Sequence, residues 1–163
     1  MKENLAKILF EKSFPLSVDE IKSDIKFNAI NEKNNDYAII LKERTRTPIV
    51  VKASEIDKQG ITKNDVVITV MYSKTHPKEG VMVYKISFMG KSLVYATDKE
   101  SYTGGDKSLS TFARETDLLI HDSQYTQIDY NSIANNKQGF GHSSFVRRSI
   151  HSGSDTAKVA GIF

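Results

Sequence analysis

The residues of this chain with the widest chemical use are its histidines and the carboxylates beside them, because the chain contains no cysteine. Three of the four histidines, His76, His121 and His142, stand next to proline, aspartate or glycine where strands are predicted to end. Neutral imidazole and carboxylate together are the ligand set of zinc, manganese or iron. Side chains at strand ends project into the crevice where α/β proteins bind ligands. A metal site is therefore one reading, although a lone histidine near a loop is more often a hydrogen-bonded structural residue.

The elements that must position these histidines are strands and short helices. The first part of the chain predicts two short helices and three exposed antiparallel strands, and from Asp65 onward Val, Ile and Tyr strengthen the strand signal. Strand, loop, helix and strand in that order indicate an α/β architecture with a sheet covered on one side by helices. The expected elements are helices beginning near Leu5 and Ser17, strands Ile25 to Ile30, Tyr37 to Leu41, Ile49 to Val51, Val66 to Tyr72, Val81 to Phe88 and Leu93 to Thr97, a helix Ser108 to Arg114 and a strand Leu118 to Ile120.

Length, composition and charge limit the class of protein. A chain of 163 residues is the length of one domain. Its content of 26% charged and 39% hydrophobic residues is typical of an ordinary globular protein. Residues 1–12 mix charges into the apolar positions, and no apolar stretch is long enough to span a membrane, so we expect a cytoplasmic protein with no membrane partner. The net charge of +3 is spread along the chain, which argues against a nucleic-acid surface.

Four motifs occur in order and carry a resemblance to a known family. They are Thr75 to Gly80 with His76, Leu93 to Glu100 with Asp98, Thr116 to Thr126 with His121 and Asp122, and Gly139 to Ser144 with His142. The residues and the order of these motifs resemble those of the metallo-β-lactamase superfamily, in the phosphodiesterase branch that includes ribonuclease Z and phosphoribosyl cyclic phosphodiesterases. The resemblance extends over about Glu3 to Ser144. It implies a partial αββα sandwich, mainly the second half of that fold, in residues 1–144, with a divergent tail at residues 145–163 that we expect to be frayed or a loosely docked helix.

The resemblance also implies roles for individual residues. His76 is expected to be a metal ligand, and Asp98 the carboxylate that bridges two divalent ions, zinc foremost, with manganese or iron as alternatives. His142 is expected near the scissile phosphate, as a proton donor or phosphate contact. At the strand end His121-Asp122, we expect Asp122 to orient a loop or a ligand rather than to bind metal. From the residues alone, a turn-forming or helix-capping aspartate is the favoured reading of Asp98, and His142 fits an exposed residue beside a helix N-terminus.

Two departures from the family limit what the chain is expected to do. The H-x-H-x-D-H motif is absent, because no histidine precedes His76, and His151 is not a convincing substitute for the family's last histidine ligand. About seven protein ligands serve the complete site, so we expect the isolated chain to bind zinc poorly. Without a first half, the inner face of the remaining sheet is expected to be exposed unless a partner polypeptide or a second copy covers it.

Two functional hypotheses follow from these expectations. In the first, the chain represents a metal-dependent hydrolase, most plausibly a phosphodiesterase acting on a phosphodiester-type small molecule or nucleotide, incomplete and inactive by itself. In the second, it is a non-catalytic, truncated or degenerate module of the same fold that binds a partner chain. The missing H-x-H-x-D-H motif favours the second for this chain, while the presence of His76, Asp98 and His142 favours the first for its ancestry.

Overall fold

The computed structural model describes residues 36–45, 48–77, 80–101, 106–144 and 158–162. The chain divides into two compact units, Met1–Lys33 and Asn34–Phe163, and every described residue belongs to the second. The helices and the strand expected before residue 36 lie outside the described residues, as does the tail between residues 145 and 157.

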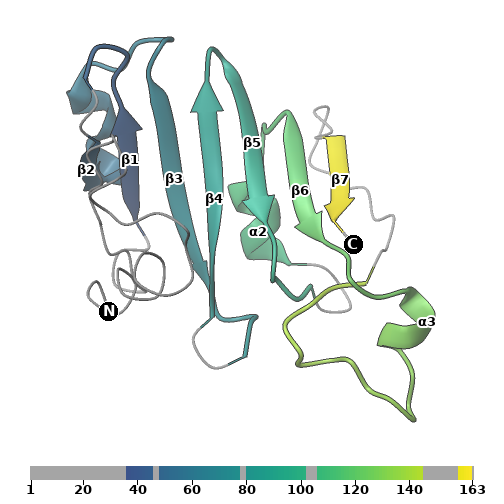
Figure 1. The fold of residues 1–163 in the computed structure, drawn as a ribbon. Helices are drawn as coiled ribbons and strands as arrows, with labels where there is room; N and C mark the ends of the chain where they lie inside the picture. Colours follow the sequence, from purple (N-terminus) through teal and green to yellow (C-terminus); the bar gives the residue numbers. More distant parts are fainter. Residues whose placement is uncertain (1–35, 46–47, 78–79, 102–105, 145–157, 163) are drawn as a thin grey trace, which may run out of the picture. The chain divides into compact units, whose positions relative to one another are not determined.

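A single mixed sheet organises the second unit (Figure 1). Its seven strands lie in the order β2-β1-β3-β4-β5-β6-β7. β1 to β5 pair antiparallel, whereas β5 with β6 and β6 with β7 pair parallel. The strands are β1 (Tyr37–Leu41), β2 (Ile49–Lys52), β3 (Val66–Ser73), β4 (Val81–Phe88), β5 (Lys91–Ala96), β6 (Leu118–Asp122) and β7 (Lys158–Ile162). This sheet, with its helices, confirms the α/β class expected from the sequence.

The hairpin between β4 and β5 shows why the sequence folds as it does locally. Phe88 pairs with Lys91, which leaves Met89 and Gly90 as a two-residue turn. Both have positive φ, 50° and 72°, and this combination is that of the type I′ turn whose twist matches the flanking strands. The sequence Met89-Gly90-Lys91 between two β-rich runs predicts a tight connection, and the structure has one, with Lys91 already in β5. The turn fixes the register of the central strands.

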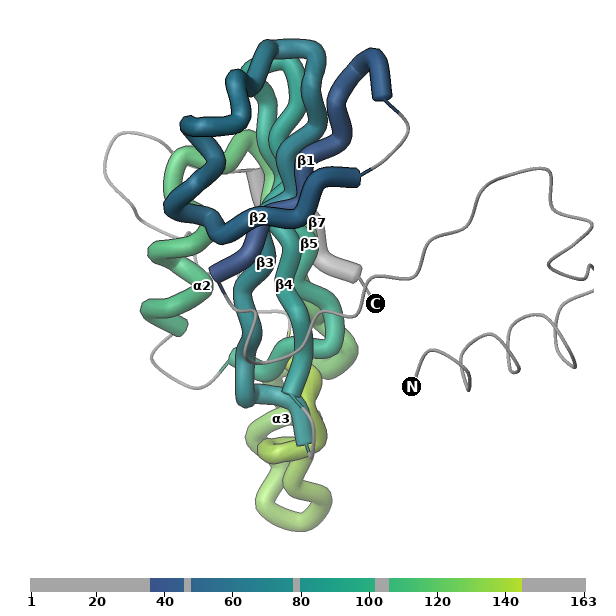
Figure 2. Tube along the Cα trace, turned by 90° about the vertical axis from the view of Figure 1, so that its left-hand side faces the viewer, coloured from purple at the N-terminus to yellow at the C-terminus, as the bar shows by residue number. Residues whose placement is uncertain are grey.

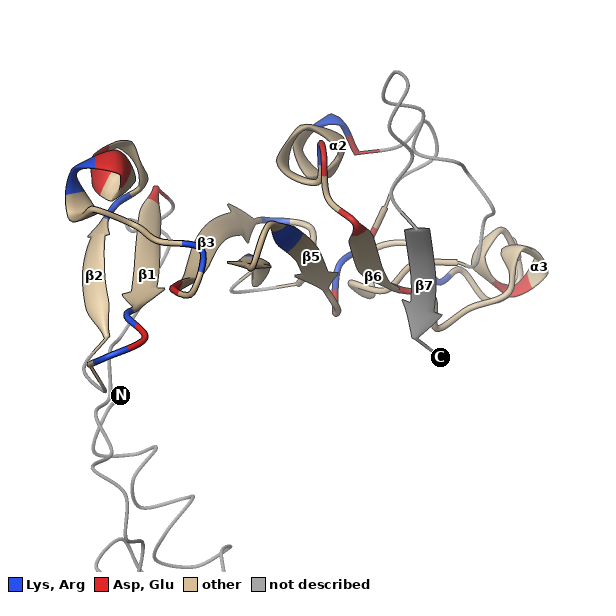
Figure 3. Ribbon diagram, turned by 90° about the horizontal axis from the view of Figure 1, so that it is seen from above, with Lys and Arg blue, Asp and Glu red and all other residues tan. Residues whose placement is uncertain are grey.

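The main hydrophobic core lies between the sheet and α2 (Lys107–Phe112). Val83, Val94, Ala96 and Leu119 project from three neighbouring strands against Leu109 of the helix, and all five side chains are buried. Each large side chain buried in this way contributes roughly 1.5–3 kcal/mol to folding. α2 and the 3₁₀ helix η4 (Ala53–Gln59) lie on the same side of the sheet (Figure 3), and the edge-on view shows α2 on that side again (Figure 2).

The opposite face of the sheet is apolar across six strands. Because cross-strand partners project from the same face, the register aligns aliphatic side chains in one continuous row. This first row consists of Val50, Ile39, Ile68, Ile86, Leu93 and Leu118. A second row on the same face consists of Val70, Tyr84, Tyr95 and Ile120. The alternation of Met82, Tyr84 and Ile86 with Val81, Val83 and Lys85 predicts one wholly apolar face for β4, and in the structure that face is the one away from α2.

The tail departs from its expected structure at residues 158–162. The expectation of a frayed segment or a loosely docked helix is wrong there, because these residues form β7 and extend the sheet in parallel beside β6. The run Lys-Val-Ala-Gly-Ile is short and follows a stretch rich in Ser and Gly, so its sequence carries little strand signal. The edge of β6 left free by β5 provides the unpaired backbone groups that such a segment can bind.

Two further elements complete the described part of the chain. η4 and the four-residue helix α3 (Gln127–Tyr130) were not expected from the sequence, and both are short. The segment that contains α3 extends beyond the ends of the strands (Figures 1 and 2). No helix among the described residues has the length and hydropathy needed to cross a bilayer.

Candidate functional site

The strand directions place several of the expected site residues at one edge of the sheet. β3 and β5 are both antiparallel to β4, and β6 is parallel to β5, so β3, β5 and β6 all end at the same edge. His76 follows β3, Asp98 follows β5, and Asp122 is the last residue of β6. This edge, outside the carboxyl ends of neighbouring strands, is where open α/β sheets bind ligands. His142 reaches the same place from the loop after α3.

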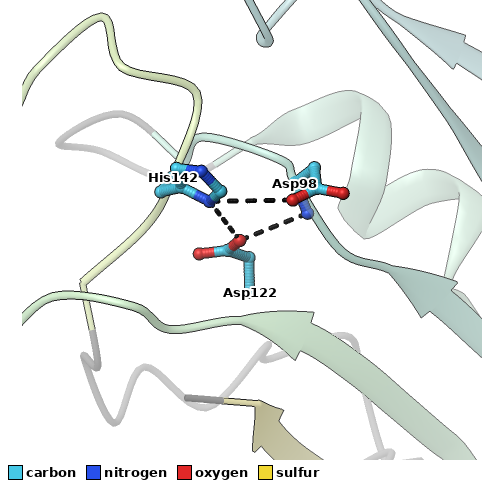
Figure 4. Close-up of side chains that lie close together, drawn as sticks. All are labelled: Asp98, Asp122 and His142. Carbon is cyan, nitrogen blue, oxygen red and sulfur yellow. Dashed lines mark hydrogen bonds and ion pairs between the residues drawn. The ribbon is translucent and has the colours of Figure 1, made fainter.

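Asp98, Asp122 and His142 form one cluster (Figure 4). A potential ligand atom from each lies within 4.8 Å of those of the other two. His142 Nδ1 is 2.7 Å from Asp122 Oδ2 and 3.9 Å from Asp98 Oδ1. The structure thus brings together three residues that are 24 and 20 positions apart in the chain. The sequence prediction had put His142 at the substrate and only Asp98 of these three at the metal.

The Asp122 carboxylate already accepts four hydrogen bonds. Its Oδ1 accepts from the backbone N–H groups of Ser143 at 2.9 Å and Gln124 at 3.3 Å. Its Oδ2 accepts from the Asp98 backbone N–H at 3.2 Å and from His142 Nδ1 at 2.7 Å. A carboxylate has about four lone-pair directions, so these donors occupy the acceptor capacity of Asp122. This buried residue therefore holds its hydrogen-bond partners in place, and its expected role of orienting a loop or a ligand stays a prediction.

Asp98 differs from Asp122 in exposure and in partners. Its side chain is 60% exposed, and its carboxylate accepts no hydrogen bond from any residue in the described ranges. Its φ of 52° lies in the left-handed region, which aspartate enters more readily than most residues. The turn at Asp98 lets its backbone N–H bond to Asp122 while the carboxylate remains open to a ligand (Figure 4).

His142 has one ring nitrogen committed and one available. Because a carboxylate without a proton can only accept, the contact with Asp122 places a hydrogen on Nδ1 of the neutral ring. Nε2 then carries the lone pair, and it points away from Asp122 (Figure 4). Tyr125 contacts the ring edge-on, with ring centroids 6.2 Å apart. The side chain is 24% exposed, so part of the ring is open to solvent.

His76 lies beside this cluster but is not one of its three members. Its ring meets the His142 ring edge-on, with centroids 6.2 Å apart, and its Nδ1 lies 3.2 Å from the Pro77 carbonyl oxygen. Its expected role as a metal ligand is neither supported nor excluded by these contacts and stays a prediction.

His121 is turned away from the cluster, because successive residues of β6 project to opposite faces. Its Nε2 lies 2.9 Å from Ser101 Oγ and its Nδ1 lies 2.6 Å from the Asp122 carbonyl oxygen. A carbonyl accepts only, so Nδ1 carries the hydrogen and Ser101 donates to Nε2. Burial holds the pKa of His121 below its usual value. His121 therefore acts as a neutral link between β6 and the turn after β5.

The turn of residues 98–101 after β5 connects every part of the site. Lys99 Nζ donates to Ser73 Oγ at 2.9 Å and to Thr75 Oγ1 at 3.2 Å, in the segment that leads to His76. It also pairs with the carboxylate of Asp106, which caps the first turn of α2. Glu100 bonds to the loop that carries His142, and Ser101 donates its backbone N–H to Ser143 Oγ at 2.8 Å.

Sequence reasoning missed Lys99 and Glu100. Both are charged and follow a strand, so they were assigned to the end of a motif without a role of their own, yet their residues are 0% and 1% exposed. Two adjacent buried charges need partners from several elements. No local pattern identifies those partners, because they lie up to 41 positions away.

The donor atoms in this cluster fit a divalent ion in kind. Two carboxylates and an imidazole suit zinc, manganese or iron, and three protein ligands are the number found at open catalytic zinc sites. The described residues include one such group of three ligands, which is enough for one ion. The resemblance implied two ions. Binding through all three side chains requires the His142–Asp122 hydrogen bond to open.

Comparison with known proteins gives limited information. No model of a known protein family matches the sequence, and no curated protein matches it. Among solved structures, the chain is similar to the metallo-β-lactamase fold protein YhfI from Bacillus subtilis, with 20% identity and a TM-score of 0.37. The similarity covers 48% of this chain and 27% of that protein, so this chain matches about a quarter of its length. The ribonuclease Z and cyclic phosphodiesterase branch stays a prediction from the motifs.

Proposed function

We propose that this chain provides part of a metal-dependent hydrolase site, and that the reaction is the hydrolysis of a phosphodiester. The observation that carries the proposal is the hydrogen-bonded pair of Asp122 and His142 beside the exposed carboxylate of Asp98. The motif resemblance supports a phosphodiester rather than another hydrolysable group. A small molecule or a nucleotide is the expected substrate.

Each residue of the cluster has a distinct task in this proposal. Asp98 offers its free carboxylate to a divalent ion, zinc first and manganese or iron next. When bound, such an ion supplies positive charge that stabilises the phosphoryl oxygens. Asp122 holds the His142 ring with its hydrogen on Nδ1. Nε2 then takes a proton from the attacking water and later releases it to the leaving oxygen of the phosphodiester. This use of a carboxylate to set the tautomer of a histidine is common at hydrolytic sites.

The described residues do not provide a full set of metal ligands on this scheme. Asp122 is occupied by its four donors and His142 by its role in proton transfer, which leaves Asp98 as the metal ligand. The proposal therefore assigns further ligands to His76, or to a second polypeptide that meets this edge of the sheet. An isolated chain is expected to bind an ion weakly and to hydrolyse phosphodiesters slowly or not at all.

Isothermal titration of the purified chain with ZnCl₂ and with MnCl₂, separately, tests the proposal. We expect one weak site whose affinity falls at least about tenfold in Asp98→Ala, because the open carboxylate is lost. Asp57→Ala is the matched control, since Asp57 is exposed in η4, far along the chain from the cluster. Absence of binding by the native chain at millimolar metal, or equal affinity in both variants, overturns the proposal.

The apolar face of the sheet favours a second candidate function. Its aliphatic row spans six strands on the side away from α2 and η4, and Tyr95 in the second row is 40% exposed. A contiguous face of this kind is typical of a surface that binds another polypeptide. We propose as the alternative a non-catalytic module whose face pairs with a second copy of the chain. Light scattering at increasing concentration tests it: a dimer that Tyr95→Lys converts to monomer supports it, and a native monomer at every concentration refutes it.

A further inference from the structure

Glu100 is a buried carboxylate to which the proposed function assigns no task. Its residue is 1% exposed, and it lies two positions after Asp98 in the turn that follows β5. Its Oε1 accepts from the Tyr130 hydroxyl at 2.6 Å and from the Gly139 backbone N–H at 2.8 Å. Its Oε2 accepts from Gly139 N–H at 3.0 Å and from Gly141 N–H at 3.1 Å.

All these donors belong to one stretch of chain, which runs from the end of α3 to the residue before His142. A carboxylate removed from water is costly unless donors replace its hydration, and among the described residues these donors come from the segment of residues 130–141. The bonds join the two ends of the loop between Tyr130 and Gly141 to a single point on the turn after β5. The loop is thus fixed by a side chain that comes from the same turn as Asp98.

The backbone at the two glycines is suited to this arrangement. Gly139 and Gly141 have φ values of 87° and 88°, in the region that favours glycine, and this lets both N–H groups face one carboxylate. A Cβ on Gly141 would lie 2.5 Å from Cδ2 of His76, so the segment also passes directly against that ring. Glycine at position 141 therefore serves the hydrogen bond to Glu100 and the close approach to His76.

His142 lies between two fixed points. On one side Gly141 is held by Glu100, and on the other Ser143 is held by Asp122 through its N–H at 2.9 Å. Ser143 Oγ also donates to the Lys99 carbonyl oxygen at 2.7 Å. With both neighbours held, the backbone of His142 is fixed at a point from which its Nδ1 lies against Asp122.

We propose that Glu100 is a positioning residue, which holds the segment of residues 139–141 so that His142 meets Asp122 and Nε2 faces the ligand. The inference rests on the proposed function for its consequence, since His142 is the group that moves the proton there. The geometry itself is testable without any metal or substrate. Replacing the carboxylate should free the segment while the sheet remains folded, because none of its four bonds goes to a strand.

Solution NMR of the full chain carries the test, with Glu100→Gln as the variant and Glu43→Gln as its matched control at an exposed position. In Glu100→Gln an NH₂ group replaces one acceptor oxygen. In place of Oε2 it leaves the Gly141 N–H without its partner, and in place of Oε1 it sets a donor against the Gly139 N–H, which then keeps only Oε2. We expect hydrogen exchange at Gly139 or Gly141 to become at least about tenfold faster and the Nδ1–H signal of His142 to disappear, while amides of β3 and β4 keep their protection. Glu43→Gln should change none of these.

A second pair of variants keeps the test decisive if Glu100→Gln fails to fold. A Cβ at Gly139 meets no atom within 4 Å, so Gly139→Ala adds only backbone strain at this point, and Gly60→Ala is its control at φ 55° with equally open space. Loss of the His142 Nδ1–H signal in Gly139→Ala but not in Gly60→Ala supports the inference. Retention of that signal in Glu100→Gln or, where that variant does not fold, in Gly139→Ala overturns it. Failure of the native chain to bind Zn²⁺ or Mn²⁺ refutes the proposed function alone.

Discussion

Replacement of Asp122 by asparagine should reverse the tautomer of His142. The amide has one oxygen and one NH₂ group, so it can keep the donors of Asp122 on one side only. If NH₂ took the place of Oδ1, the backbone N–H groups of Ser143 and Gln124 would both lose their acceptor. If it takes the place of Oδ2, only the Asp98 N–H loses one, because the imidazole can shift its hydrogen to Nε2 and accept at Nδ1. The second orientation costs less and should be adopted.

The number of hydrogen bonds lost in Asp122→Asn determines how far the free energy of unfolding falls. One hydrogen bond between a backbone N–H and a carboxylate is lost, at 3.2 Å, which lowers the free energy of unfolding by about 1–2 kcal/mol. The effect on proton transfer should be much larger than the effect on stability. A histidine in the wrong tautomer lowers kcat by about 10⁴ in Ser-His-Asp triads, where the carboxylate has the same orienting role.

Long-range ¹H–¹⁵N correlation on uniformly labelled protein measures the tautomer directly. At about pH 8.5, where an ordinary imidazole is neutral, the hydrogen should be on Nδ1 in the native chain and on Nε2 in Asp122→Asn. Asp98→Asn is the control, because its carboxylate lies 3.9 Å from Nδ1 and makes no hydrogen bond to it, so this variant should retain the native tautomer. A hydrogen that stays on Nδ1 in Asp122→Asn would refute the reasoning.

Two further predictions concern stability. Lys99→Met leaves the Asp106 carboxylate without its buried cation and should lower the free energy of unfolding in urea by about 3–5 kcal/mol, whereas Lys58→Met, at a side chain 74% exposed, should change it little; equal effects would contradict the buried pairing. Backbone N–H groups of Thr62 and Glu43 hold the pKa of Asp65 well below its usual range, so its stabilising effect is complete above about pH 4 and is lost as the pH falls further. The stability of Asp65→Asn should therefore fall less steeply with decreasing pH than that of the native chain. The same pH dependence below about pH 4 in both proteins would show that Asp65 does not contribute to acid unfolding.

The strands near the site could be predicted from the sequence because their signals are local. Val81–Phe88 was predicted with its observed bounds, and the tight connection predicted at Met89, Gly90 and Lys91 is the turn Met89-Gly90, because Lys91 already belongs to β5. The strand predicted at Val66 to Tyr72 extends one residue further, to Ser73. In each case the side chains that pack are also the ones that carry the propensity. For such segments, local pattern and tertiary structure agree.

The candidate site was predictable in its residue types and not in its pairings. Asp98, Asp122 and His142 were identified from their motifs and lie together in the structure, whereas their roles, including the orienting role of Asp122, stay predictions. The burial of Glu100 was not predictable, because its partners come from the loop of residues 130–141 and only the folded chain brings them near. β7 was missed for a related reason, since its strand conformation depends on the free edge of β6.

The turn of residues 98–101 sets a limit on how this region can change in length. Four consecutive residues each bond to a different part of the site: Asp98 to Asp122, Lys99 to the segment before His76, Glu100 to the loop before His142, and Ser101 to Ser143. Insertion or deletion of a single residue there would move all four of these contacts out of register at once. Transfer of this site to another scaffold would therefore require the tetrapeptide to be moved intact, with its spacing from β5 unchanged.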